Sequence, residues 1–193
     1  MKTGSDVIGP YRLALADTPE LIHVAYKLRH HAYCMRAGFE RRDMADMEVD
    51  GFDRRAVHVL VFYRDWPLAC ARLILPPVLP LLHHCPDVPL EPGAAEVSRF
   101  SIPAPTARQT FNVITVLRLL GQGVWEAGQR HRVASYYLLM KPALKSLLKR
   151  AGFECEPVGA PVELHGRRIP TRFSQITAAE REDGVFQHPE PRA

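Results

Sequence analysis

The chain has 193 residues and a formal net charge of +4, and hydrophobic residues make up 47% of it. This composition is typical of a soluble globular domain with a sizeable core. The basic excess is too small to indicate a nucleic-acid partner, and no apolar run is long enough to predict a transmembrane segment. The N-terminus shows no signal-peptide pattern, so we expect a cytoplasmic protein.

Three regions are expected along the chain. Residues 1–10 are short and polar, which predicts a flexible N-terminus, and residues 11–176 are expected to form a single domain. Residues 177–193 contain one large aliphatic side chain and one aromatic, so we expect a disordered tail there.

The domain begins with a predicted strand at 11–16. A helix is predicted from Pro19, because proline suits a first helical turn, to Gly38, because glycine commonly ends helices. Apolar residues recur along this helix at spacings of three and four, which predicts one buried stripe. The stripe consists of Leu21, Ala25, Leu28, Ala32 and Met35. Two strands, 57–63 and 68–75, flank the turn sequence RDWP and predict a hairpin.

Six prolines between residues 76 and 92 predict a long loop of the kind that forms lids or binding walls. A strand with a possible bulge, a helix, a buried strand, a second helix, a short strand and a hairpin follow in that order. Their predicted ranges are 95–102, 110–127, 133–140, 142–150, 153–158 and 162–176. Hairpins followed by strand–helix–strand units predict an α/β fold, in which a mixed central sheet carries helices on both faces.

The stretch 46–53, DMEVDGFD, places four carboxylates in eight residues. An EF-hand calcium loop starting at Asp46 would need an oxygen ligand at its ninth position and a glutamate at its twelfth. This chain has Arg54 and Val57 there, and its cysteines and histidines show no zinc-ligand spacing, so no metal site is expected. A catalytic or ion-pairing acid cluster and a plain solvated turn remain as alternatives.

Four motifs in order carry a family resemblance: LRHHAYCMRAGFE, EVDGFDRRAVHVLV, ARLILPP and EVSRF. Between residues 28 and 172 the chain resembles the acyl-homoserine-lactone (autoinducer) synthases and the related N-acyl amino acid synthases. It looks most like the acyltransferases associated with PEP-CTERM/exosortase systems. The resemblance implies a fold like that of the Gcn5-related N-acetyltransferases (GNAT). It also implies transfer of a fatty acyl group from an acyl-carrier-protein thioester to a primary amine, without a tightly bound cofactor.

The acceptor implied by the resemblance is an amino acid or a similar small amine. Autoinducer synthases usually carry a tryptophan after the first helix, where this chain has Phe39, which favours the amino-acid-acylating relatives. The alternative is an acyl-homoserine-lactone synthase that uses S-adenosylmethionine (SAM).

The acyl donor is expected to be acyl carrier protein, and less often acyl coenzyme A. Related folds that bind coenzyme A use an R/Q-x-x-G-x-G/A loop. Arg118, Gly121 and Gly123 match that pattern, but they lie inside a predicted helix. No glycine occurs at 104–109, where such a loop would follow its strand, so we interpret the match as accidental.

The amine that attacks a thioester must lose a proton, and a nearby carboxylate can accept it. Glu96 is the first candidate for this base or for an acceptor-orienting group, and Glu48 is the second. An ion pair between Glu96 and an arginine is an equally good interpretation. Lysines 141, 145 and 149 share one face of the predicted helix 142–150 and are candidates for docking a carrier protein, or are simply solvated.

The other residues of the resemblance are assigned to substrate binding or to an ion-pair network. Asp50 and Asp53 are expected to orient arginines, because buried charges must be paired. The remaining members are Arg29, Tyr33, Phe39, Arg72, Ser98 and Arg99. Arg29 and Arg99 could either pair with carboxylates of the protein or bind the acceptor. The two aromatic residues could either line the acceptor site or pack in the core.

Overall fold

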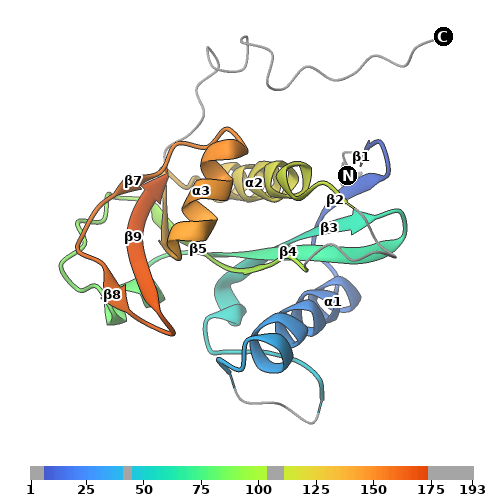
Figure 1. Ribbon diagram of the computed structural model, residues 1–193, viewed down its shortest axis with the longest axis horizontal. Coiled ribbons are helices and arrows are strands. Elements are labelled where there is room, and N and C mark those ends of the chain that lie inside the picture. Colours follow the sequence, from blue (N-terminus) through green and yellow to red (C-terminus); the bar gives the residue numbers. More distant parts are fainter. Residues whose placement is uncertain (1–6, 41–44, 104–110, 174–193) are drawn as a thin grey trace.

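The computed structural model describes residues 7–40, 45–103 and 111–173, which contain a nine-stranded sheet and three α-helices (Figure 1). The strands are β1 (Val7–Ile8), β2 (Tyr11–Leu15), β3 (Ala56–Tyr63), β4 (Trp66–Ile74), β5 (Ala94–Ser101), β6 (Ser135–Met140), β7 (Glu156–Pro157), β8 (Val162–Glu163) and β9 (Arg167–Phe173). The helices are α1 (Pro19–Arg29), α2 (Val113–Arg130) and α3 (Pro142–Arg150). The predicted tail, 177–193, lies outside the described residues.

The sheet is mixed, as predicted. Its order is β1-β2-β3-β4-β5-β6-β9-β7, with β8 paired to β9. Neighbours along β1 to β5 are antiparallel, β5 and β6 are parallel, and β6 and β9 are antiparallel. The sheet starts earlier than the expected domain start at residue 11, because a turn at Gly9, with φ of +57°, lets Val7 pair with Arg12.

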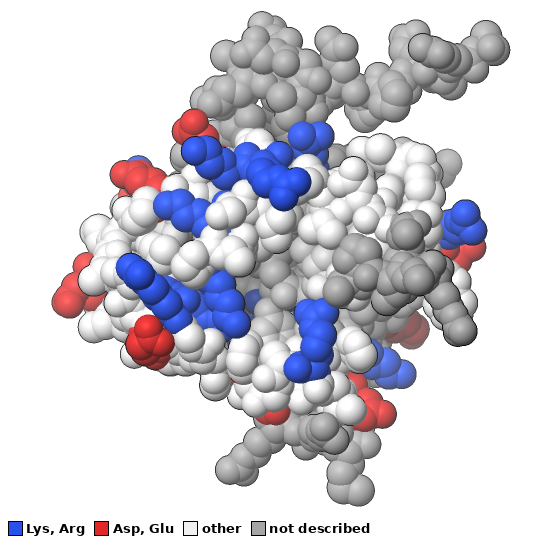
Figure 2. Space-filling view, in the orientation of Figure 1, with Lys and Arg blue, Asp and Glu red and all other residues white. Residues whose placement is uncertain are grey.

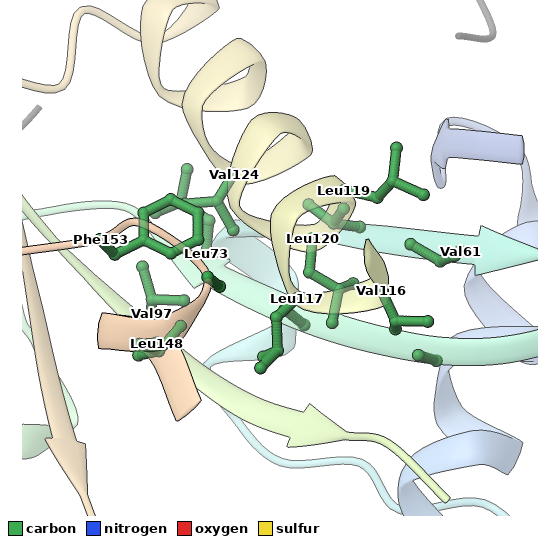
Figure 3. Close-up of a cluster of buried hydrophobic side chains, with 14 of the residues drawn as sticks. Val61, Leu73, Val97, Val116, Leu117, Leu119, Leu120, Val124, Leu148 and Phe153 are labelled. Atoms are coloured by element: carbon green, nitrogen blue, oxygen red, sulfur yellow. The ribbon is translucent and has the colours of Figure 1, made fainter. Parts of the chain in front are cut away.

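Helices cover both faces of the sheet, which confirms the predicted layers (Figure 1). Leu73 and Val97 point toward α2 and α3, whereas their strand neighbours Arg72 and Glu96 point to the opposite face, where α1 lies. Figure 3 shows the core between the sheet and the two C-terminal helices. Its labelled side chains are Val61, Leu73, Val97, Val116, Leu117, Leu119, Leu120, Val124, Leu148 and Phe153. No helix among the described residues is long and apolar enough to span a membrane.

The first predicted helix divides into two parts. Thr18 caps α1 through a hydrogen bond from the backbone N–H of Leu21, and a π-helical segment, His30–Arg36, continues the chain. Because the π turn widens the helix, the buried stripe does not continue at its regular spacing, and Met35 is 46% exposed. Its predicted burial is therefore wrong, whereas Gly38 adopts φ of +64° and ends the segment as predicted.

The loop predicted from the prolines forms a packed wall on the α1 side of the sheet. It contains a short 3-10 helix, Pro80–His83, and has a small apolar core that includes Leu79, Leu81 and Val88. The hydroxyl of Tyr137 in β6 donates to the carbonyl of Pro89 at 3.1 Å and accepts from the N–H of Glu91 at 3.2 Å. These contacts fix the loop, which we call the proline wall (residues 75–93), against the sheet.

Several predicted boundaries differ from the structure, and two of the differences have a clear structural reason. The turn between β3 and β4 is tighter than the RDWP pattern suggests, and Trp66 already belongs to β4. The strand predicted at 153–158 is reduced to β7, because Phe153 turns into the core against α2, where its ring packs on Gly121. Gly121 and Gly123 both lie within α2 and contact the core closely, so the phosphate-loop match is accidental, as interpreted.

Candidate active site

A network of buried ion pairs joins α1 to the acidic segment. Arg29 ends α1 and is fully buried; its Nη1 and Nη2 donate to the two carboxylate oxygens of Asp53 at 2.6 and 3.0 Å. Its Nε donates to Glu48 at 2.5 Å. Burial alone would raise the pKa of Asp53, but Arg29 and neighbouring donors lower it to about 2. The guanidinium of Arg29 therefore has carboxylate partners on both edges.

Arg72 of β4 ties the same acidic segment to the sheet. Its Nη1 donates to Asp50 at 2.7 Å and to Asp53 at 2.9 Å, and its Nε donates to the hydroxyl of Ser98 in β5 at 3.1 Å. The backbone N–H of Asp50 donates to Asp53 at 2.7 Å, which closes the turn of the segment. The acidic stretch is thus folded around the two arginines.

Arg99 supplies the third cation. It lies in the predicted bulge, which is present: Cys70 pairs with Ser101 but Arg72 pairs with Ser98, so β5 carries one extra residue, and Arg99 has φ of +54°. Its Nε and Nη2 donate to Glu48 at 3.1 and 2.9 Å. Burial alone would raise the pKa of Glu48, but the two flanking arginines lower it, so this carboxylate stays ionised.

The acid cluster contains no metal site among the described residues, where no group of three or more carboxylate, histidine or cysteine side chains could hold an ion. Arginines occupy the carboxylate oxygens that a cation would need. The Asp46 side chain is 82% exposed and lies 3.9 Å from His30, outside the network.

Glu96 is different from every other carboxylate at the site. It lies on β5, is only 5% exposed, and within the described residues forms no ion pair. Its Oε2 accepts a hydrogen bond of 2.6 Å from the backbone N–H of Leu81 in the proline wall. Burial raises the pKa of Glu96 to about 7, although the Leu81 N–H and the charges of Arg72 and Arg99 oppose the rise. A carboxyl with this pKa changes its protonation state near neutral pH.

The two aromatic residues of the resemblance lie at the same face. The hydroxyl of Tyr33, on the π-helical segment, donates to the carbonyl of Phe100 at 2.9 Å, next to the bulge. Burial raises the pKa of Tyr33 to about 12, so its hydroxyl stays protonated. Phe39 stacks on His165 of the β8–β9 turn with ring centroids 4.6 Å apart. Phe39 is therefore half-buried between the N-terminal and C-terminal halves of the chain.

Sequence reasoning missed several residues that the structure places beside this site. His58 on β3 is buried, and its Nε2 lies 3.6 Å from Asp53; burial lowers its pKa to about 4, so it is neutral. The sequence around His58 in β3 gives no sign of this contact. Leu81 acts through its backbone N–H, which leaves no mark in a sequence. Lys141 and Arg168 contact the Phe39 ring, and this depends on the pairing of β9 with β6, which is far along the chain from Phe39.

No protein-family model matches the chain. An acyl-homoserine-lactone synthase of Vibrio anguillarum is 23% identical to it over 162 residues, which span 79% of this chain and 84% of the relative. That relative is an acyltransferase, and the chain is an enzyme of this class.

Solved structures agree on the fold. The acyl-homoserine-lactone synthase LasI has a TM-score of 0.70 at 16% identity, over 88% of this chain and 90% of LasI. BjaI, a coenzyme-A-dependent synthase solved with SAM and isopentyl-CoA, has a TM-score of 0.69 at 20% identity, over 94% and 93% of the two chains. A structure from Lactobacillus plantarum assigned to the N-acetyltransferases reaches 0.60 at 12% identity, over 88% and 100%. The GNAT-like fold implied by the family resemblance is thus confirmed.

Proposed function

We propose that this protein transfers an acyl group from an acyl thioester to the amine of a small acceptor, and that Glu96 is the base. The observation that supports this role is a buried carboxyl that forms no ion pair with any described residue and has a pKa of about 7, at the sheet face shared with the arginine network. Enzymes raise carboxyl pKa values by burial when a carboxylate must exchange protons near neutral pH.

The reaction needs no covalent enzyme intermediate. The neutral amine attacks the thioester carbonyl, a C–N bond forms, and the C–S bond breaks. Glu96 takes the proton that the amine loses and can pass it to the departing thiolate, so that the products are an amide, a thiol and a regenerated carboxylate. Glu48, the second candidate, is less suited to this role because Arg29 and Arg99 lower its pKa and engage both of its oxygens.

The arginine network has a positioning role in this proposal. Arg29, Arg72 and Arg99 link α1, the acidic segment and two strands through Glu48 and Asp53. Breaking such a buried pair by removing one partner leaves a charge without compensation and costs about 3–5 kcal/mol. In this proposal the network therefore holds α1, the acidic segment and the two strands, which border the acceptor site, in fixed positions relative to Glu96.

We propose two alternative acceptors, an amino acid and SAM, and the comparisons support SAM better. An amino acid acceptor is supported by Phe39, which replaces the tryptophan usual in autoinducer synthases, and would fit the N-acyl amino acid synthases associated with exosortase systems. SAM, with an acyl-homoserine lactone as product, is supported by the similarity to the Vibrio anguillarum synthase and to LasI and BjaI. In both acceptors the reacting amine is attached to a carbon that also carries a carboxylate.

We propose that the acyl donor is acyl carrier protein. We also propose that the protein is located in the cytoplasm. The glycine-free sequence at 104–109 supports this donor, although these residues lie outside the described structure. Acyl coenzyme A is the alternative, since BjaI is coenzyme-A-dependent. The lysine stripe expected to dock the carrier is incomplete: Lys141 is the N-cap residue of α3 and its ammonium lies over Phe39, which leaves Lys145 and Lys149 on the helix.

Mass spectrometry of lipids from cells that express the wild-type protein or the Glu96→Gln variant tests the proposal. We expect a new N-acyl amino acid or acyl-homoserine lactone in the wild-type strain and a large loss of it in the variant strain. Which of the two compounds appears decides the acceptor. If the folded wild-type protein produces neither compound, and purified protein transfers no acyl group from acyl carrier protein or coenzyme A, the proposal is wrong.

A further inference from the structure

Three basic side chains surround Phe39 where the two halves of the chain meet. Lys141 Nζ lies 4.9 Å and Arg168 Cζ 5.7 Å from the centroid of the Phe39 ring, and His165 stacks on the ring. They come from the start of α3, from β9 and from the β8–β9 turn. Figure 2 shows Lys and Arg side chains gathered where β8 and β9 lie in Figure 1.

These cations lie on the same face of the sheet as Glu96. Tyr137 of β6 is the register partner of Glu96, and in β9 the register partner of Tyr137 is Arg172. Because side chains alternate along a strand, Arg168, four residues from Arg172, points to that face as well. Glu96 and Arg168 therefore lie on the same side of the sheet, the side from which an acceptor would approach Glu96.

Within the described ranges, the charges of Lys141 and Arg168 beside Phe39 have no carboxylate partner. Arg29, Arg72 and Arg99, by contrast, all form ion pairs with carboxylates. In the part of the chain that the structure describes, the Arg168 side chain uses one donor, Nε, which donates to the carbonyl of Leu164 at 2.8 Å. The nearby carboxylate of Glu40 is held by Arg99 at 3.0 Å. The outer edge of the Arg168 guanidinium is thus left for a ligand.

We propose that Arg168 and Lys141 form a subsite, over the ring of Phe39, that binds the carboxylate of the acceptor. This inference rests on the proposed acyl transfer and assigns the anion-binding role to these two residues in place of Arg29 and Arg99, which the sequence left open. A guanidinium edge suits a carboxylate because two parallel N–H donors meet two oxygens. Holding the carboxylate orients the amine on the same carbon, which is how a positioned substrate gains rate.

An anionic group of the donor has similar chemistry, because the pantetheine arm of both carrier protein and coenzyme A carries phosphate. Steady-state kinetics of the Arg168→Gln variant with each substrate varied in turn separates the two sources. The matched control is Arg167→Gln, which removes the same charge from the adjacent, exposed residue. We expect the acceptor KM to rise roughly tenfold to a hundredfold in Arg168→Gln, the range for lost hydrogen bonds to a charged group. The donor KM and the Arg167→Gln control should change little.

A second readout uses the acceptor itself. Amidation of the acceptor carboxylate should lower kcat/KM strongly in the wild-type enzyme but little in Arg168→Gln, because the partner of the carboxylate is already gone. An unchanged acceptor KM, or a rise in the donor KM alone, would overturn the inference while wild-type activity persists. Absence of transfer by the wild-type enzyme would instead overturn the proposed function, so the two failures are distinguishable.

Discussion

Replacing Glu96 by glutamine should stabilise the protein above neutral pH while it removes activity. The carboxyl of Glu96 has an ordinary pKa of 4.5 when the chain is unfolded and a pKa of about 7 in the folded protein. At about 1.4 kcal/mol for each pKa unit, keeping it ionised in the folded state costs about 3 kcal/mol. The Glu96→Gln side chain stays neutral and can still accept the Leu81 N–H bond, so the variant avoids this cost.

The sign of the pH dependence follows from proton linkage. Between pH 4.5 and 7 the folded protein binds the Glu96 proton more tightly than the unfolded chain, so wild-type stability falls as the pH rises through this window. The free energy of unfolding of the Glu96→Gln variant, relative to wild type, should therefore increase by about 2–3 kcal/mol between pH 5 and pH 8. Other titrating groups are common to both proteins and cancel in this comparison.

Urea denaturation of both proteins at pH 5, 6, 7 and 8 measures the difference. The same residue should give wild-type kcat/KM an acidic limb near pH 7, since the ionised form is the base, and this limb should disappear in the variant. A stability difference that is the same at pH 5 and pH 8 would refute the burial argument. A variant that retains wild-type activity would refute the role of Glu96 as base.

Three further outcomes test other parts of the structure. Asp53→Asn should lower the free energy of unfolding by about 3–5 kcal/mol in urea titrations, because it leaves buried arginines underpaired, whereas the exposed Asp46→Asn should change it by less than about 0.5 kcal/mol. Gly123→Ala should lower the free energy of unfolding by about 1–3 kcal/mol despite the better helix propensity of alanine, since the new Cβ would lie 2.4 Å from Val59 Cγ1. The control is Gly51→Ala, whose Cβ would meet nothing within 4 Å. Equal shifts of the melting temperature for the two variants would contradict the packing around Gly123. Calcium should leave the melting temperature unchanged, and a rise of several degrees would mean that the acidic segment binds the ion.

The network also limits which residues can meet the substrates. An arginine that already donates to two carboxylates, as Arg29 does, has little left to offer a ligand. The same argument applies to Arg72, whose Nη1 and Nε are engaged by Asp50 and Ser98. Under our proposals, arginines that are paired with carboxylates have a positioning role, whereas Arg168, which forms no ion pair within the described part of the chain, is available for recognition.

The elements and their order could be predicted from the sequence because local signals were strong. Proline at the first turn of α1 and α3, glycine after the π-helical segment and after α3, and apolar strands between polar turns are encoded within a few residues. The same holds for the acidic segment and for the ordered motifs that led to Glu96 and the arginines. The π-helical segment, which exposes Met35, has no comparable local signal and was missed.

Only the tertiary structure determines which partner each charged residue has and how deeply it is buried. Glu96 and Glu48 were the first and second candidates for one role, and the sequence could not show their protonation behaviour, because a carboxyl pKa depends on burial and on neighbours far along the chain. Folding places Glu48 between Arg29 and Arg99, and places Glu96 under the proline wall, where it accepts the N–H of Leu81. It also brings Arg168 to Phe39, 129 positions earlier in the chain, a juxtaposition that depends on the pairing of β9 with β6.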